Sequence, residues 1–133
     1  MTTLRYVANE LPDQRAMQDL MTSAWASPSQ TQWGPVLERS LCWVCAYHDE
    51  QLVGFVNVAW DGGMHASIFD TSVHAEYQHQ GIGTALLHRA ISEATSRGAE
   101  WLHVDFEPHL EGFYTRAGFR PTTAGLLRLT DPA

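Results

Sequence analysis

The fold is decided by the stretch Tyr77-Gln78-His79-Gln80-Gly81-Ile82-Gly83-Thr84-Ala85-Leu86-Leu87, in which two glycines open a helix. The helix carries an apolar stripe with spacings of three and four residues, and Arg97 and Gly98 end it. Glycines at a helix start let an anion approach the backbone, where free N–H groups and the positive end of the helix dipole hold it. The stretch therefore predicts a phosphate-bearing ligand at residues 78–84.

The glycine spacing limits the kind of phosphate ligand. A dinucleotide-binding fingerprint needs a third glycine where Leu86 stands, and a P-loop needs a lysine, which this sequence lacks. Both departures disfavour a nucleotide-binding regulator. The pattern that remains is Gln-x-x-Gly-x-Gly, from Gln78 to Gly83. Taken alone, it is also typical of a plain helix N-terminus with flexible glycines.

A second segment further along the chain narrows the interpretation. It is Phe113-Tyr114-Thr115-Arg116-Ala117-Gly118-Phe119, which has the pattern of a helix that ends in glycine and leads into a strand. The first pattern resembles the acyl-CoA-binding signature Gln/Arg-x-x-Gly-x-Gly/Ala of the GNAT superfamily of N-acetyltransferases. The second resembles their Tyr-x-x-x-Gly-Phe segment, and the hydrophobic run that ends at Val73 stands at the expected distance before Gln78. By this resemblance the chain is identified as a member of that superfamily.

The resemblance implies a mixed α+β fold in one domain, residues 1–133. Its central, mostly antiparallel sheet is splayed between the fourth and fifth strands and flanked by about four helices. The apolar patterning predicts strands at 4–7, 42–48, 52–60, 67–73 and 101–106, and a final hairpin made of 119–120 and 126–129. Helices are predicted to begin at Leu11-Pro12-Asp13, with Pro12 in the first turn, and to cover 33–39, 81–97 and the residues from Leu110 to Ala117.

The composition of the chain limits the classes of binding partner and the cellular compartment that we expect. The net charge of −7 argues against a nucleic-acid backbone or an anionic membrane surface as the main partner. No apolar run approaches transmembrane length and the start does not resemble a signal peptide, so the cytoplasm is the expected location. Cys42 and Cys45 fall on one predicted strand, where residues three apart face opposite sides. They are therefore interpreted as buried structural cysteines, and no metal is expected.

The resemblance also implies an activity: direct transfer of the acetyl group of acetyl-CoA, the cosubstrate, to a primary amine of a small molecule or peptide. Carried over by position, the backbone of Thr71, Ser72 and Val73 would pair with the pantetheine arm of CoA. The N–H groups of residues 78–84 would hold its pyrophosphate, and His79 is a further candidate for a phosphate contact.

Tyr114 matches the superfamily tyrosine that commonly protonates the leaving thiolate. A phenol with an ordinary pKa near 10 is protonated at neutral pH and can donate there. Alternatively, Tyr114 is an aromatic residue of the core. The neighbouring Phe113 already fills that role.

The general base is the least determined residue. The histone-type branch of the superfamily has a glutamate where this chain has Ser67. Another branch has a CoA-contacting asparagine where this chain has Glu107, which sets a carboxylate beside the splay. Asp70 is the other main candidate, with Asp105 and His109 as alternatives, and a water-mediated base or an already deprotonated acceptor stays open.

The same carboxylates predict the charge of the acceptor. Asp70, Asp105 and Glu107 are all expected near the splay, and the nearest basic side chains, Arg116 and Arg120, are expected beyond it. Such a cluster attracts a cation and, by like-charge repulsion, raises the pKa of at least one member. A cationic amine is therefore the predicted acceptor.

Two alternatives stay open in the sequence. Trp25 and Trp33 are candidate walls of the acceptor site or simply covers of the sheet. Because Ser67 replaces the usual glutamate, the competing function is a non-catalytic CoA-binding or acyl-CoA-binding regulatory module. A homodimer is the expected assembly, since dimers are common in the superfamily.

Overall fold

A five-stranded sheet forms the centre of the computed structural model, which describes residues 3–131. Its strands follow the chain order: β1 (Leu4–Ala8), β2 (Ser40–His48), β3 (Gln51–Trp60), β4 (His65–Val73) and β5 (Trp101–His103). The first four strands are antiparallel neighbours, whereas β5 runs parallel to β4. This mixed, mostly antiparallel sheet confirms the predicted fold class.

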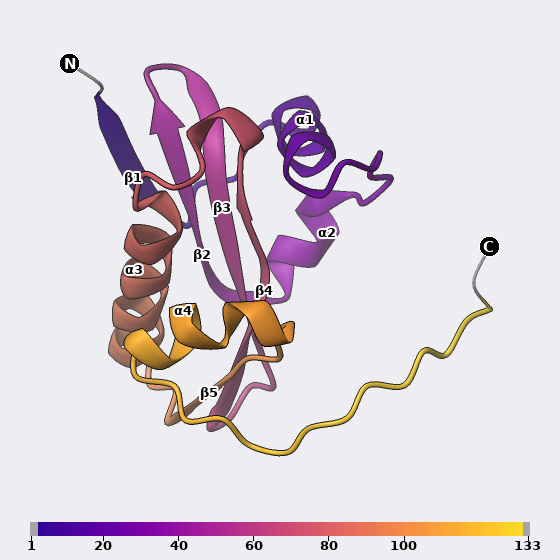
Figure 1. Ribbon diagram of the computed structural model, residues 1–133, viewed down its shortest axis with the longest axis vertical. Helices are drawn as coiled ribbons and strands as arrows, with labels where there is room; N and C mark the ends of the chain where they lie inside the picture. Colours follow the sequence, from indigo (N-terminus) through magenta and orange to yellow (C-terminus); the bar gives the residue numbers. More distant parts are fainter. Residues whose placement is uncertain (1–2, 132–133) are drawn as a thin grey trace.

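The helices cover both faces of the sheet. In Figure 1, α1 (Gln14–Trp25) and α2 (Trp33–Glu38) lie on one side of the sheet and α3 (Ile82–Ser96) on the other. The fourth helix, α4 (Glu111–Arg116), follows β5. Two short 3₁₀ turns complete the chain, η1 (Ala75–Tyr77) before α3 and η2 (Pro108–Leu110) before α4.

The core is divided into two clusters by the sheet. Alternate side chains of β2 and β3 point to opposite faces, so Cys42 belongs to the cluster under α3 and Cys45 to the cluster under α1 and α2. Both thiols are free and buried, as predicted. Burial raises the pKa of Cys42 to about 11 and that of Cys45 to about 12, so both stay protonated and unreactive at neutral pH.

The start of α1 lies slightly later than the sequence indicates. Asp13 is the N-cap, and its carboxylate accepts a hydrogen bond of 3.0 Å from the backbone N–H of Ala16. Pro12 therefore stands before the cap, so its expected place in the first helical turn is wrong. The buried face of the helix is formed by Met17, Leu20 and Met21.

A glycine in the middle of β3 fixes how closely α3 approaches the sheet. A Cβ atom at Gly54 would lie 2.9 Å from Leu86 Cδ1 and 3.0 Å from Ile82 Cγ2, so any side chain there would force these neighbours in α3 to shift. The first turn of α3 is thereby pressed against the centre of the sheet, directly beside the end of β4.

The strands β4 and β5 separate after a short pairing. Their contact covers only His65–Trp101, Ala66–Leu102 and Ser67–His103. Beyond Ser67, β4 continues along β3 without β5, which confirms the predicted splay. The predicted strand over 101–106 is consequently limited to its first three residues, because the later ones have lost their hydrogen-bonding neighbour.

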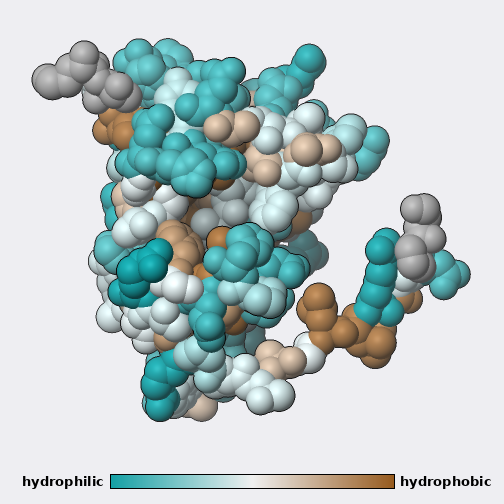
Figure 2. Space-filling view, viewed as in Figure 1, coloured by the Kyte–Doolittle hydropathy of each residue, from teal (hydrophilic) through white to brown (hydrophobic). Residues whose placement is uncertain are grey.

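The predicted final hairpin is wrong. Residues 117–131 contain no strand, and every residue of 120–131, hereafter the arm, is exposed. In Figure 1 the arm runs away from the sheet as an extended chain, and Figure 2 shows apolar side chains on it, far from the body. These include Leu126, Leu127 and Leu129, which find no apolar surface of their own chain to cover.

Candidate active site

The N-terminus of α3 has the features of an anion site. The first helical bond runs from Ala85 N–H to Gly81 C=O at 3.0 Å, so the N–H groups of residues 82–84 point out of the helix end. No side chain caps them. Gly81 has a φ of +85° and His79 a φ of +63°, which together form the left-handed turn into the helix.

The loop before α3 is anchored to the end of β4. The side-chain amide of Gln78 donates a hydrogen bond of 3.2 Å to the carbonyl of Val73. A Cβ atom at Gly83 would lie 3.5 Å from the Phe113 ring and 3.8 Å from Val73 Cγ2. The helix start, the strand end and α4 therefore meet at one place, the mouth of the splay, and the predicted phosphate-binding residues lie together there.

A buried hydroxyl at the splay also fits the CoA that the sequence implies. Thr71 Oγ1 is inaccessible and has no hydrogen-bond partner among the described residues. Buried polar atoms almost always have partners, and an exception calls for a missing one. Thr71 lies on the part of β4 that β5 no longer covers. A polar ligand chain between the parted strands would lie next to this hydroxyl.

Tyr114 lies beside Thr71 in an aromatic cage. It is 5% exposed and stacks on Phe106 with ring centroids 5.0 Å apart, while Phe113 and Phe119 contact it edge-on. Burial raises the pKa of the phenol, the Thr71 hydroxyl lowers it by less, and Asp105 raises it further. The two hydroxyls are thus neighbours, although they do not meet in full hydrogen-bonding geometry. Tyr114 therefore belongs to the core and still carries a phenolic proton at the splay.

Asp70 lies on the opposite face of the sheet, in a strained conformation. Its φ of +57° is uncommon for a residue other than glycine, and such residues cluster at functional sites. It borders a cavity of about 450 Å³, the α1–α2 pocket, lined by Met21, Trp25, Ser27, Pro28, Ser29, Thr31, Trp33, Val36 and Asp70. One side of the residue is open to solvent, but desolvation by neighbouring atoms still raises the pKa of its carboxyl. The expected like-charge repulsion is not the cause.

A hydrogen-bonded chain fixes Trp25 over the strand end. Its indole N–H donates to Ser72 Oγ at 2.9 Å, and that hydroxyl lies 2.9 Å from the Asp70 carbonyl, to which it donates. Trp25 is 59% exposed and borders the α1–α2 pocket, while its role as a wall of the acceptor site stays a prediction. Trp33 is 3% exposed and packs edge-on against Phe55, so it mainly covers the sheet while it closes the pocket floor. No pattern in the sequence predicts the hydrogen bond between the Trp25 indole and the Ser72 hydroxyl.

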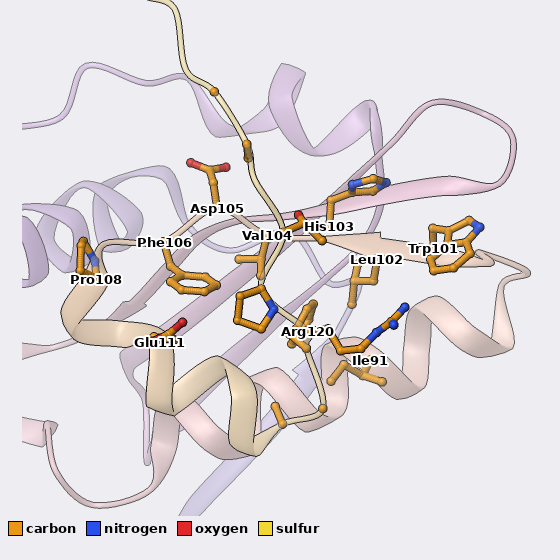
Figure 3. Close-up of a pocket in the computed structure, with 17 residues that line it drawn as sticks. Ile91, Trp101, Leu102, His103, Val104, Asp105, Phe106, Pro108, Glu111 and Arg120 are labelled. Carbon is orange, nitrogen blue, oxygen red and sulfur yellow. The ribbon is translucent and has the colours of Figure 1, made fainter.

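The other candidate carboxylates, Asp105 and Glu107, do not border the α1–α2 pocket. Asp105 borders a second cavity of about 930 Å³, the β5 groove, which follows residues 101–106 and the start of the arm. Figure 3 shows Asp105 and His103 pointing to one side of this segment, and Leu102 and Phe106 to the other. Arg120 borders the same groove, so this groove contains a basic side chain beside Asp105. Asp70 and Asp105 therefore do not share one cluster.

Glu107 and His109 are less enclosed. Glu107 is exposed and stands before η2 without a capping hydrogen bond, and the exposed His109 lies within that turn. Neither borders the α1–α2 pocket or the β5 groove. Of the candidate bases, Asp70 is thus the one that lies in a cavity with apolar walls and without a basic neighbour lining it.

The histidines form one close pair, His65 Nδ1 and His103 Nε2, which lie 2.7 Å apart across β4 and β5. Within residues 3–131, no three histidine, cysteine, aspartate or glutamate side chains are grouped so as to hold a metal ion. In the same part of the chain, no helix has the length and apolar character that a membrane crossing requires.

Comparison with known proteins identifies a family and several relatives that this chain resembles. The model of the acetyltransferase (GNAT) family matches residues 7–119 of this chain. The uncharacterised N-acetyltransferase ycf52 of Pyropia yezoensis is 30% identical over 71 residues, which cover 53% of this chain and 41% of that protein. The chloroplastic serotonin N-acetyltransferase 2 of Oryza sativa subsp. japonica is 31% identical over 67 residues, which cover 50% of this chain and 34% of that protein. The match thus spans less than half the length of these curated relatives.

A solved structure shows the shared fold over the whole chain. The GNAT-family acetyltransferase of Streptococcus pneumoniae TIGR4 superimposes with a TM-score of 0.81 at 20% identity. The superposition covers 98% of this chain and 100% of that one.

Proposed function

The chain belongs to the acetyltransferase (GNAT) family, and from this premise we propose that it transfers the acetyl group of acetyl-CoA directly to a primary amine. The observation that carries the proposal is the meeting of three features at the mouth of the splay. These are the uncapped N-terminus of α3, the unpartnered Thr71 hydroxyl and the Tyr114 phenol. A helix end that binds phosphate, a gap that accepts a polar chain and a proton donor are the parts that this reaction needs.

The backbone has a defined part in the proposal. The N–H groups of residues 82–84, with the loop 78–81, hold the pyrophosphate of acetyl-CoA. The strand end formed by Thr71, Ser72 and Val73 aligns the pantetheine arm in the gap that β5 leaves. When bound, acetyl-CoA supplies an activated acetyl group on a thiol that can leave.

Two side chains move protons in the proposal. Tyr114 gives its proton to the departing sulfur, and because burial raises the pKa of this phenol it is protonated at neutral pH and has a proton to give. Asp70 takes the proton that the attacking amine loses, and its raised pKa brings it closer to the working pH of a base. Glu107, exposed beside η2, is the second candidate for this base.

The acceptor is proposed to be a cationic amine of a small molecule or peptide. The α1–α2 pocket presents one carboxylate, Asp70, next to the exposed indole of Trp25 and to the hydroxyl-bearing residues Ser27, Ser29 and Thr31. An ammonium group is attracted both by the carboxylate and by the face of an indole ring. The rice relative is named for an amine substrate, serotonin, which supports an amine acceptor here.

The test combines CoA binding with turnover. Gly83→Val adds a branched side chain where a single Cβ already contacts Phe113 and Val73, so it crowds the backbone that the phosphate must approach. We expect the Kd for CoA, measured by calorimetry, to rise at least about tenfold. Gly83→Ala adds only the tolerated Cβ and is the matched control. An unchanged Kd in the valine variant would refute the CoA site.

Turnover is measured as thiol release from acetyl-CoA with a panel of primary amines. Amine-dependent release supports the enzyme. Tight CoA binding without release with any amine would instead mark a CoA-binding regulatory module. We also propose that residues 1–133 form a single functional domain, which expression of these residues alone would test. A cytoplasmic location is proposed as well, and a fluorescent fusion would test it.

A further inference from the structure

The two tryptophans that border the α1–α2 pocket differ in how their indole N–H groups are satisfied. The indole N–H of Trp25 donates to Ser72 Oγ at 2.9 Å. The indole N–H of Trp33 is buried and has no hydrogen-bond partner among residues 3–131. Buried polar groups in proteins almost always have a partner. Because an indole N–H can only donate, this group at a cavity calls for an acceptor atom that the chain itself does not supply.

Trp33 is held firmly by both its backbone and its ring. The side chain of Gln14, at the start of α1, donates to the Thr31 carbonyl at 2.8 Å and accepts from the Trp33 backbone N–H at 3.0 Å. The Trp33 ring packs edge-on against Phe55 of β3, with ring centroids 5.3 Å apart. The residue is therefore fixed in place, and only its indole N–H is left without an acceptor.

The lining of the pocket restricts the kind of acceptor atom that Trp33 can meet. Asp70 is the one ionisable side chain among the lining residues, and its carboxylate repels an anionic group, so the acceptor atom belongs to a neutral group. Met21, Pro28 and Val36 make the rest of this lining largely apolar. At about 450 Å³, the cavity is at the small end of the range of about 300–1,000 Å³ for ligand sites. The neutral acceptor atom and the amine therefore belong to one small molecule or to the end of one peptide.

We propose that the amine substrate carries a neutral carbonyl oxygen close to its amine, as an amino-acid amide or a peptide N-terminus does, and that Trp33 donates its indole N–H to this oxygen. The inference rests on the proposed acetyl transfer and narrows its substrate. Asp70 attracts the ammonium group, Trp33 binds the oxygen, and the apolar lining contacts the side chain. A protonated alkylamine or polyamine offers only donors and leaves the indole N–H unpaired.

The oxygen reaches the buried indole by a small rearrangement of the pocket lining. Met21 borders the pocket and belongs to the same core cluster as Trp33. A methionine side chain is unbranched and adapts its shape readily, so it can make room for an oxygen atom beside the indole.

The first experiment observes the indole itself by NMR. The chain has five tryptophans, so ¹⁵N-labelled tryptophan gives five indole N–H signals, and Trp33→Phe identifies the signal of Trp33. In the presence of CoA, L-leucinamide is expected to shift this signal downfield, because the proton enters a hydrogen bond. The matched control is 3-methylbutylamine, which is leucinamide without its carboxamide and should cause no downfield shift. An unmoved signal at saturating leucinamide, or no binding of leucinamide up to about 10 mM by calorimetry, overturns the proposal.

The second experiment measures selectivity in turnover, as the ratio of kcat/KM for leucinamide to kcat/KM for 3-methylbutylamine. The two amines differ in basicity, so the change of this ratio on mutation is the test. Trp33→Phe removes the donor, and the ratio should fall by at least about tenfold. If phenylalanine unfolds the chain, 3-benzothienylalanine at this position replaces the N–H by sulfur at nearly the same size and serves both experiments.

The matched control for selectivity is Trp25→Phe. It removes an indole N–H that is already bonded to Ser72, so it should keep the leucinamide ratio whatever it does to the two rates. An unchanged ratio in the Trp33 variant, or an equal fall in the Trp25 variant, overturns the proposal.

The two experiments also separate this inference from the proposed acetyl transfer. A shifted Trp33 signal without thiol release would support the contact with the carbonyl oxygen and refute transfer to these amines. Thiol release with an unmoved signal would support the transfer and refute the contact.

Discussion

The two strands that part at the splay lead to two aspartates, Asp70 in β4 and Asp105 after β5, and the surroundings of the two residues differ. On the α1–α2 face, Asp70 has a left-handed backbone, lies against Trp25 in a pocket and is desolvated. Asp105, on the segment that follows β5, is exposed like Asp70, but its side chain points away from Leu102 and Phe106 (Figure 3), borders the β5 groove with Arg120 and raises the pKa of the Tyr114 phenol. The parting of the two strands thus gives two similar residues different surroundings, and on this difference rests our proposal that Asp70, and not Asp105, accepts the proton.

The largest expected effect tests this contrast directly. Asp70→Asn removes the proposed base and the carboxylate that attracts the amine, so kcat/KM for the best amine should fall by about 10²- to 10⁴-fold. Asparagine also tolerates the left-handed backbone, so the fold is kept. The matched variant Asp105→Asn should stay within about tenfold of wild type.

The pH profile of the Asp70 variant sharpens the same test. If the carboxylate accepts the proton, its loss should be partly rescued at high pH, where the amine is already neutral. Equal losses in the two variants would remove the proposed distinction between the two aspartates, and a larger loss in Asp105→Asn would reverse it.

The next largest effect is expected at Tyr114, the proposed proton donor. Tyr114→Phe keeps the aromatic cage but removes the phenolic proton, so kcat should fall by about ten- to a hundredfold. The loss is expected to be smaller than for the base, because a thiol with a pKa near 8.5 is a tolerable leaving group without an acid. CoA affinity should be unchanged. A variant with wild-type kcat would leave Tyr114 as a core residue only.

A smaller effect is expected from salt. If the single carboxylate of the α1–α2 pocket attracts the acceptor, cationic amines should be preferred over acidic ones, and the preference should shrink as salt rises. Screening shortens from about 30 Å at 0.01 M to about 3 Å at 1 M. Steady-state rates over a charge-graded amine panel measure this. The preference should disappear in Asp70→Asn but persist in Asp105→Asn; if glutamate outcompetes the cations in wild type, the pocket does not select by charge.

The smallest effect is on stability. The pKa of Asp70 is raised on folding from its ordinary 3.8, so the folded chain binds more protons just above that pH than the unfolded chain does. Ionised Asp70 therefore costs stability, and the cost appears as the pH rises through the raised pKa. Asp70→Asn should be more stable than wild type at pH 7, by on the order of a few tenths of a kcal/mol, since water screens the open side of the carboxyl. Urea unfolding at pH 7 and below pH 3.8 checks this, and a gain that is independent of pH would indicate the backbone preference of asparagine instead.

Local patterns in the sequence were sufficient for much of the fold. The two glycines predicted the start of α3, and the apolar patterning predicted the start of the strand at residue 101, because both depend on near neighbours. The arm was not predictable, since an apolar alternating segment indicates a strand without saying where its partner edge is. The separation of Asp70 from Asp105 also escaped the sequence. It depends on a left-handed residue in β4 and on the place where two strands part, and neither has a local signature.

The brevity of the β4–β5 pairing has a dynamic consequence. Backbone pairing joins β5 to the sheet over only three residues, and beyond them the segment with α4 and Tyr114 is held by side-chain packing against the core. Few bonds need to break for this segment to open, so it should behave as a cooperative unit of lower stability than the β2–β3 core. In amide hydrogen exchange, we expect the protons of Trp101, Leu102 and His103 to exchange well before those of the central strands. A ligand that bridges the two sides of the splay should slow them selectively, which would make β5 a natural reporter of occupancy.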